Sequence, residues 1–134
     1  LKGGMNVAVA TPDGYKPDGA VLEFTKGYGD KFALETDPFM AASGADILIT
    51  DTWTSMGEEA EKEERKKIFK DYQINRQLLA AANAGAMVQH CLPAYRGQEI
   101  TEEVFEEHAD EIFNEAENRL HAQKAVMVKL MEKD

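Results

Sequence analysis

The chain has 134 residues, with 25 acidic against 15 basic residues and a formal net charge of −10 at pH 7. This length predicts one domain, and the acidic balance argues against nucleic-acid binding, which needs clustered Lys and Arg. The apolar runs are too short to cross a membrane. A single cysteine cannot form an internal disulfide and no signal peptide is visible, so we expect a cytoplasmic protein.

Short strands and helices alternate along the first half of the chain. Apolar runs bounded by turn residues predict strands at residues 5–10, 32–35 and 47–50, and weaker helical patterns at residues 20–28 and 38–43. Asp37 is placed to cap the second helix, with Pro38 in its first turn and Gly44 at its end. The chain opens on Leu1 rather than Met, so we expect it to be part of a larger protein.

The second half continues the alternation. We expect helices at residues 58–71, 76–84, 102–107 and 118–133, a strand at residues 87–91, and a short extended piece at residues 112–113. Asn75 is the predicted N-cap of the second of these helices and Gly85 its end, and Thr101 opens the third. The first is supported by the i,i+4 pairs Glu58/Lys62, Glu61/Arg65 and Glu63/Lys67.

This order predicts an α/β fold: a three-layer sandwich with a mainly parallel, doubly wound, Rossmann-like sheet covered on both faces. Ligands of such folds bind outside the carboxyl ends of the strands. Unusual residues stand at three such ends, at residues 11–12, 51–57 and 90–97. These segments are therefore the candidate functional sites.

The segment at residues 51–57 reads D-T-W-T-S-M-G. A carboxylate at Asp51 could pair with an ammonium group at the edge of the sheet, and Ser55 offers a hydroxyl. The same segment also fits an ordinary helix entry, with Ser55 as N-cap and Glu58 three residues later. On physical grounds alone the helix entry is favoured, although it gives the two large apolar residues of the loop no role.

Cys91 lies in H-C-L-P at residues 90–93, at the end of a predicted strand. Its thiol could be a nucleophile, a metal ligand, a hydrogen-bonding group or a small core residue. A metal site is disfavoured because His108 and His121 lack ligand-like spacing. Covalent catalysis needs a base within reach, and His90 would point to the opposite face if the strand continued through it. The proline has no N–H to extend a β-ladder, so nearby carbonyls are free for a ligand.

Arg119 stands at the start of the predicted terminal helix, close in sequence to Glu115 and Glu117. A positive side chain there opposes the helix dipole, so we expect it to have a specific partner. An ion pair with either glutamate and a role in ligand binding are equally compatible with the sequence.

Together these segments resemble the ornithine-binding half of the ornithine carbamoyltransferases. The resemblance rests on Asp51 with S-M-G at residues 55–57, on H-C-L-P at residues 90–93 and on E-N-R at residues 117–119. It extends over nearly the whole chain, since T-P-D-G-Y at residues 11–15 also follows the family pattern. The S-M-G loop separates the chain from the aspartate-using branch.

The resemblance implies transfer of the carbamoyl group of carbamoyl phosphate to the δ-amine of L-ornithine, giving citrulline and phosphate. It implies no metal and no organic cofactor. Asp51 would receive the α-ammonium group of ornithine, and Ser55 and Met56 would contact the amino-acid end of the substrate from a closing loop.

The same resemblance implies that Cys91 and the carbonyl of Leu92 lie at the δ-amine and the carbamoyl group. Cys91 would hold the amine rather than attack. Arg119 would polarise the carbamoyl oxygen as negative charge develops on it, so Cys91 and Arg119 are the expected catalytic residues.

Residues 1–134 would then form the C-terminal domain of the enzyme, without the N-terminal domain that binds carbamoyl phosphate. Half an active site is expected to be inactive alone, and full-length members of the family are homotrimers assembled largely through the absent half. The apolar residues of the terminal helix spread around much of its circumference, so we expect it to expose an apolar patch, fold back or self-associate.

Two other functions remain open from the sequence. The first is a carbamoyltransferase that uses another amine, such as putrescine or N-acetylornithine. The second is a non-catalytic α/β scaffold domain.

Overall fold

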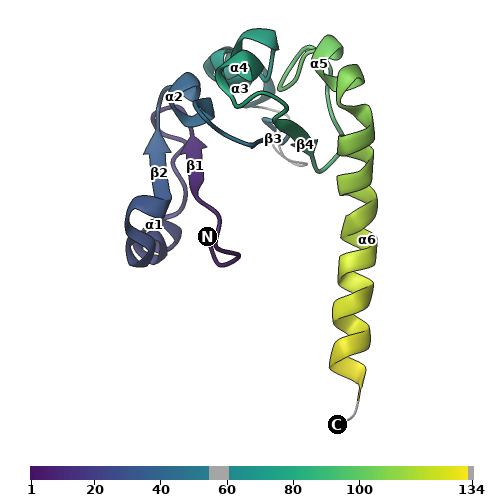
Figure 1. The fold of residues 1–134 in the computed structure, drawn as a ribbon. Coiled ribbons are helices and arrows are strands. Elements are labelled where there is room, and N and C mark those ends of the chain that lie inside the picture. Colours follow the sequence, from purple (N-terminus) through teal and green to yellow (C-terminus); the bar gives the residue numbers. More distant parts are fainter. Residues whose placement is uncertain (55–60, 133–134) are drawn as a thin grey trace.

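The computed structural model describes residues 1–54 and 61–132 of the chain (Figure 1). Its strands are β1 (Val7–Ala10), β2 (Phe32–Glu35), β3 (Ile47–Thr50) and β4 (Met87–His90). Its helices are α1 (Gly19–Thr25), α2 (Pro38–Ala42), α3 (Lys62–Phe69), α4 (Arg76–Ala81), α5 (Glu102–Glu107) and α6 (Ala109–Met131). Short 3-10 segments follow α1 at Lys26–Lys31 and α3 at Lys70–Tyr72.

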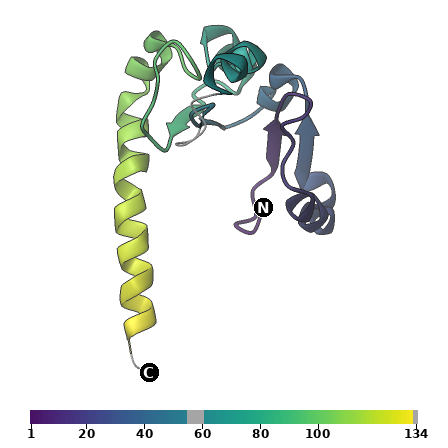
Figure 2. The ribbon, with the colours of Figure 1, turned by 180° about the vertical axis from the view of Figure 1, so that it is seen from behind.

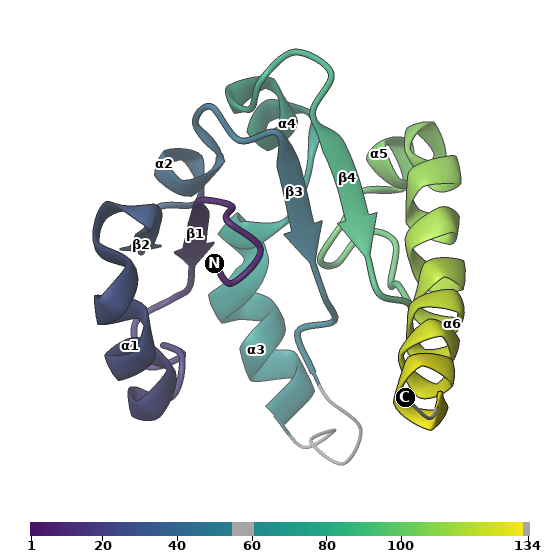
Figure 3. The same ribbon diagram turned by 60° about the horizontal axis from the view of Figure 1, so that its bottom comes forward.

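All the strand pairing between these elements is parallel. β1 pairs with β2, with Val7 opposite Phe32, and β3 pairs with β4, with Ile47 opposite Met87. In the described residues these are two separate two-stranded pairs, joined through helices, and Figure 3 shows β3 and β4 running side by side. The predicted α/β class with parallel strands is confirmed.

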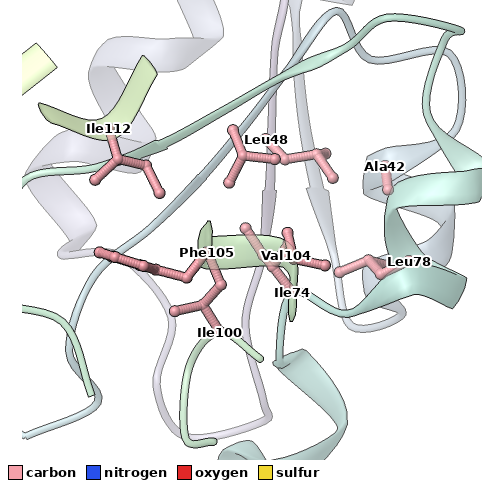
Figure 4. Close-up of a cluster of buried hydrophobic side chains, with 9 residues drawn as sticks. Ala42, Leu48, Ile74, Leu78, Ile100, Val104, Phe105 and Ile112 are labelled. Atoms are coloured by element: carbon pink, nitrogen blue, oxygen red, sulfur yellow. The ribbon is translucent and has the colours of Figure 1, made fainter. Parts of the chain in front are cut away.

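The hydrophobic core lies on one face of the β3–β4 pair (Figure 4). It is formed by Ala42, Leu48, Ile74, Leu78, Val88, Ile100, Val104, Phe105 and Ile112. Successive strand residues point to opposite faces, so Leu48 is buried while Ile49 is 68% exposed. The expectation that both faces of this strand are covered is therefore not met within the described residues.

Two helices that line this core begin with a side-chain cap, of which the first was predicted. The Asn75 side chain accepts a hydrogen bond from the Leu78 N–H at 2.9 Å, and Thr101 accepts one from the Val104 N–H at 3.4 Å. Both donor residues are buried, so each cap holds the first turn of its helix at the point where an apolar side chain enters the core. Asp37 caps α2 in the same way.

Helix α4 ends earlier than predicted, at Ala81 rather than at residue 84, so Gly85 does not end it. Asn83 accounts for the difference. Its N–H donates to the Ala45 carbonyl at 3.0 Å, and its side chain donates to Asp46 at 2.7 Å. These bonds draw the chain toward β3 and compete with continuation of the helix.

Several other predicted boundaries also shift. β1 begins at Val7 rather than at residue 5, β4 ends at His90, and α1 ends at Thr25 before a 3-10 segment. The start of the predicted helix at residues 58–71, with its Glu58/Lys62 pair, lies outside the described residues. Its remaining ion pairs are Glu61 with Arg65, as predicted, and Glu63 with Lys66 instead of Lys67.

Helix α6 differs most from the prediction. Residues 112–113 are not an extended piece but part of this helix, which begins at Ala109 instead of residue 118. Asp110 and Glu111 in the first turn suit the positive end of the helix dipole. The Glu111 carboxylate also accepts a hydrogen bond from the Val88 N–H of β4 at 2.8 Å, which fixes the helix start against the sheet.

After passing β4, α6 continues well beyond the rest of the chain (Figures 1 and 2). Its distal half carries exposed apolar side chains, namely Leu120, Val126, Met127, Val128, Leu130 and Met131. Of the three outcomes predicted for this helix, the structure shows the exposed patch. Among the described residues, no helix has the length and apolar character required to span a bilayer.

This patch is expected to make the isolated chain bind apolar dyes and self-associate as its concentration rises. Replacing Leu130 and Met131, each 80% exposed, with Gln should weaken both effects without lowering thermal stability. Sedimentation and dye fluorescence measure the two properties. A monomer at all concentrations, with no dye signal, would contradict this expectation.

Candidate functional site

The site is built at the carboxyl ends of β3 and β4. Thr50 and His90 are register partners at the last position of the two strands, so the next residues, Asp51 and Cys91, leave the sheet side by side. One carboxylate oxygen of Asp51 and the sulfur of Cys91 lie within 4.8 Å of each other. The structure therefore brings together two of the residues predicted for this site.

The surroundings of Cys91 favour the neutral thiol. Its pKa is raised above the usual value, first by partial burial and then by the hydrogen bond and negative charge of Asp51. Glu115 also raises it and Arg119 lowers it. The thiolate is the nucleophilic form of cysteine, so this site favours a Cys91 that binds rather than attacks.

Arg119 reaches the same point from α6. Its Nη1 donates a hydrogen bond to the Cys91 carbonyl at 3.1 Å, while the neighbouring Glu117 is bound to His121. Arg119 lies inside α6 rather than at its start, so the predicted conflict with the helix dipole was wrong. The prediction of a specific partner is confirmed, but that partner is a backbone carbonyl.

Two carboxylates and one guanidinium thus surround the thiol. Glu115 has one buried carboxylate oxygen without a hydrogen-bond partner among the described residues. Asp51 is exposed and is held by the Thr52 N–H, which donates to its Oδ1 at 2.7 Å. The excess of negative groups suits a ligand with amino groups, and the guanidinium suits a ligand with a carbonyl or carboxylate oxygen.

The chain was compared with known protein families. Residues 1–130 match the family described as aspartate/ornithine carbamoyltransferase, Asp/Orn binding domain. The chain belongs to this family.

Individual relatives agree with the family match. An ornithine carbamoyltransferase of Gloeobacter violaceus is 55% identical over 134 residues, which cover 97% of this chain and 43% of the relative. The anabolic ornithine carbamoyltransferase of Campylobacter jejuni superposes with a TM-score of 0.87 at 45% identity, covering 92% and 42% of the two chains. An acetylornithine transcarbamylase complexed with acetylcitrulline gives a TM-score of 0.75 at 27% identity, covering 97% and 41%. The chain thus spans less than half the length of these relatives.

The other residues predicted for the site are Leu92, which the structure describes, and Ser55 and Met56, which it does not. Leu92 follows Cys91 with a φ of 54° and a cis bond to Pro93, an isomer that the sequence left open. Ser55 and Met56, with the alternative capping role of Ser55, lie outside the described residues. Just before them, Trp53 stacks on Phe69 with ring centroids 6.1 Å apart, which gives one of the two apolar loop residues a packing role.

Two other features do not join this site. The segment at residues 11–12 follows β1, in the other strand pair. A surface hollow of about 530 Å³ is lined by residues that include Phe39, Trp53 and Lys66, but by none of Asp51, Cys91 and Arg119. The convergence of these three side chains, rather than a large cavity, marks the site.

His90 brings a third possible metal-binding group near Asp51 and Cys91, with ligand atoms within 4.8 Å of one another. Both of its ring nitrogens are already used, however. Nδ1 accepts a hydrogen bond from the Leu92 N–H at 2.9 Å, and Nε2 lies 3.1 Å from Glu99 Oε1. A metal ion would have to break one of these buried contacts, so the cluster does not fit a metal site.

Glu99 was not among the residues predicted for the site. This residue is fully buried although glutamate is almost never buried without a partner. The only local signal was its place beside the apolar Ile100, in a segment otherwise rich in polar residues. Its contact with His90 spans nine positions of an irregular loop, which no periodic pattern predicts.

Replacing Asp51 with Asn is expected to increase the alkylation rate of Cys91. The substitution removes a negative charge that raises the thiol pKa, so more thiolate is present at a fixed pH. We expect a roughly threefold to tenfold faster reaction with iodoacetamide near pH 8, since one pKa unit changes the thiolate fraction about tenfold. Cys91 is the only cysteine, so the reaction reports on this site alone.

The matched control is Glu117→Gln, which removes one negative charge from the same helix as Arg119. Glu117 is bound to His121 and does not contribute to the shift of the Cys91 pKa, so this variant should react like the unmodified chain. An equal or slower reaction of the Asp51→Asn variant would refute the assignment of Asp51 to the thiol.

Proposed function

We propose that this chain is the ornithine-binding half of an ornithine carbamoyltransferase and that it is inactive alone. The complete enzyme would convert carbamoyl phosphate and L-ornithine into L-citrulline and phosphate. The observation that carries the proposal is that Asp51 and Arg119, from distant parts of the sequence, both engage Cys91. The family match over residues 1–130 supports the same proposal.

The proposed chemistry needs an unprotonated amine, a carbonyl carbon and a place for negative charge. The δ-nitrogen of ornithine forms a bond to the carbamoyl carbon, the bond from that carbon to the phosphate oxygen breaks, and the amine loses one proton. Phosphate leaves with the bonding electrons and takes up the proton that the amine releases. The enzyme therefore has to orient two substrates and stabilise the oxygen of a tetrahedral intermediate.

The residues of this chain fit these tasks. Asp51 is an exposed carboxylate, so it is accessible to the ammonium group of a ligand. Cys91, with its raised pKa, can hold the amine without forming a covalent bond, and the Leu92 carbonyl would lie beside it. Arg119 would stabilise the developing negative charge on the carbamoyl oxygen, and Ser55 and Met56 would contact the amino-acid end of ornithine.

Ornithine is the preferred amine because the curated relatives at 49–55% identity, from Gloeobacter violaceus to Carboxydothermus hydrogenoformans, are named ornithine carbamoyltransferases. The acetylornithine transcarbamylase is more distant, at 27%. We further propose that the complete protein is a cytoplasmic homotrimer that uses no cofactor and is completed by a domain that binds carbamoyl phosphate.

Calorimetric titration of the chain with L-ornithine, and with putrescine and N-acetylornithine as controls, tests the binding half of the proposal. Saturable heat with ornithine alone supports it, and a non-catalytic scaffold should give none with any amine. Addition of the carbamoyl-phosphate domain of a relative, followed by a citrulline assay, tests the reaction. Turnover with putrescine or N-acetylornithine in preference to ornithine would overturn the choice of substrate.

A further inference from the structure

A buried polar pair lies directly behind the segment that carries Cys91. His90 and Glu99 have side chains that are 0% and 1% exposed, and His90 Nε2 lies 3.1 Å from Glu99 Oε1. Buried polar pairs are costly unless their hydrogen bonds are satisfied, so this pair calls for a specific role. Neither side chain has a place in the reaction proposed above.

The hydrogen bonds determine which nitrogen of His90 carries the proton. Nδ1 faces the N–H of Leu92 at 2.9 Å and can only accept, so the ring proton must be on Nε2, where it donates to Glu99. Glu99 Oε1 also accepts a hydrogen bond from the Tyr95 N–H at 2.5 Å. The carboxylate thus selects one tautomer of the imidazole, and that tautomer presents a lone pair to Leu92.

His90 and Glu99 both hold the backbone of the loop that connects them. Leu92 has a φ of 54°, a conformation that side chains with a Cβ rarely adopt, and its N–H is fixed by His90. Glu99 is itself anchored, because its carbonyl accepts a hydrogen bond from the N–H of the buried Ile74 at 2.9 Å. The core is therefore connected through Glu99 and His90 to the residue beside the thiol.

We propose that His90 and Glu99 are positioning residues, which hold the backbone of Leu92 so that the Cys91 thiol and carbonyl meet Asp51 and Arg119. The identity of the molecule bound there rests on the proposed function, but the positioning itself does not. Preorganisation of this kind is what binding sites require, since small displacements of a binding group lower affinity and rate.

Two amide substitutions separate the two hydrogen bonds of His90. In His90→Asn the Oδ1 atom replaces Nδ1 and can still accept from Leu92, whereas in His90→Gln the Nε2 amide replaces the ring Nε2–H and can still donate to Glu99. Loss of the Leu92 bond should release the thiol from Asp51 and from burial. We expect iodoacetamide to alkylate Cys91 roughly fivefold faster in His90→Gln near pH 8, and within about twofold of the unmodified rate in His90→Asn.

Equal rates in both variants, whether unchanged or increased, would overturn the proposal, since a merely structural role would not distinguish them. If a variant does not fold, nitrogen NMR of His90 in the unmodified chain decides the question. The proposal requires a protonated Nε2 and an unprotonated Nδ1 at neutral pH, together with slow exchange of the Leu92 amide hydrogen. A proton on Nδ1 would refute it, whatever the ornithine titration shows, while absence of ornithine binding with these signatures present would refute only the proposed function.

Discussion

Replacement of Arg119 with Met is expected to lower citrulline formation about 10²- to 10³-fold in an enzyme that contains this chain together with the carbamoyl-phosphate domain. The guanidinium would stabilise charge that develops only in the transition state, so the loss should fall mainly on kcat rather than on KM. Met keeps the length and the apolar stem of the side chain while removing its hydrogen bond to the Cys91 carbonyl.

Arg76→Met is the matched control for this experiment. Arg76 is also exposed, but it pairs with Glu103 and Glu107 on α5, away from Cys91. Its replacement should leave the rate within about twofold of the unmodified enzyme, because surface ion pairs contribute little. Similar losses in both variants would mean that Arg119 has no special part in the reaction.

Replacement of Ile112 with Ala is expected to reduce the free energy of unfolding by about 3 to 4 kcal/mol, the range for large-to-small changes in a packed core. Ile112 is fully buried and fixes the start of α6 against the sheet and α5 (Figure 4). Urea unfolding followed by circular dichroism measures the change. The net stability of a domain is only about 5 to 15 kcal/mol, so the variant should be close to unfolding.

Leu120→Ala provides the comparison within the same helix. Leu120 is exposed in the chain, so its truncation should change stability by less than about 0.5 kcal/mol. If both substitutions cost the same, the packing of α6 described above would be incorrect.

Local signals in the sequence predicted much of the fold. The boundaries of β2 and β3 were predicted without error, because each is an apolar run bounded by turn or capping residues. The cap Asn75 was also identified, since a side-chain oxygen that accepts a hydrogen bond three residues later is a local feature. The start of α6 was missed because the pair Ile112 and Phe113 is too short for its periodicity to separate a strand from a helix.

The site was predictable only in part, for a related reason. Asp51 follows one predicted strand and Cys91 ends another, and parallel strands place their carboxyl ends at one edge, so their proximity could be inferred. The contact of Arg119 with Cys91 depends on how α6 lies along β4, across 28 positions of sequence. The resemblance to a known family predicted that Arg119 belongs to the same site as Cys91, whereas a positive charge at a helix start, the physical reason given for a partner, is not what the structure has.

The single uninterrupted rod of α6 joins two environments. Ile112 and Glu111 hold its first turns against the sheet, and its distal end is exposed. Arg119 lies between these two parts of the helix. At 1.5 Å per residue, Met131 is about 18 Å from Arg119 along the axis, so the helix acts as a lever whose pivot lies near the sheet. A protein surface that binds the free end would shift the guanidinium relative to the Cys91 carbonyl, and assembly with a neighbouring domain would thereby alter the hydrogen bond between Arg119 and Cys91.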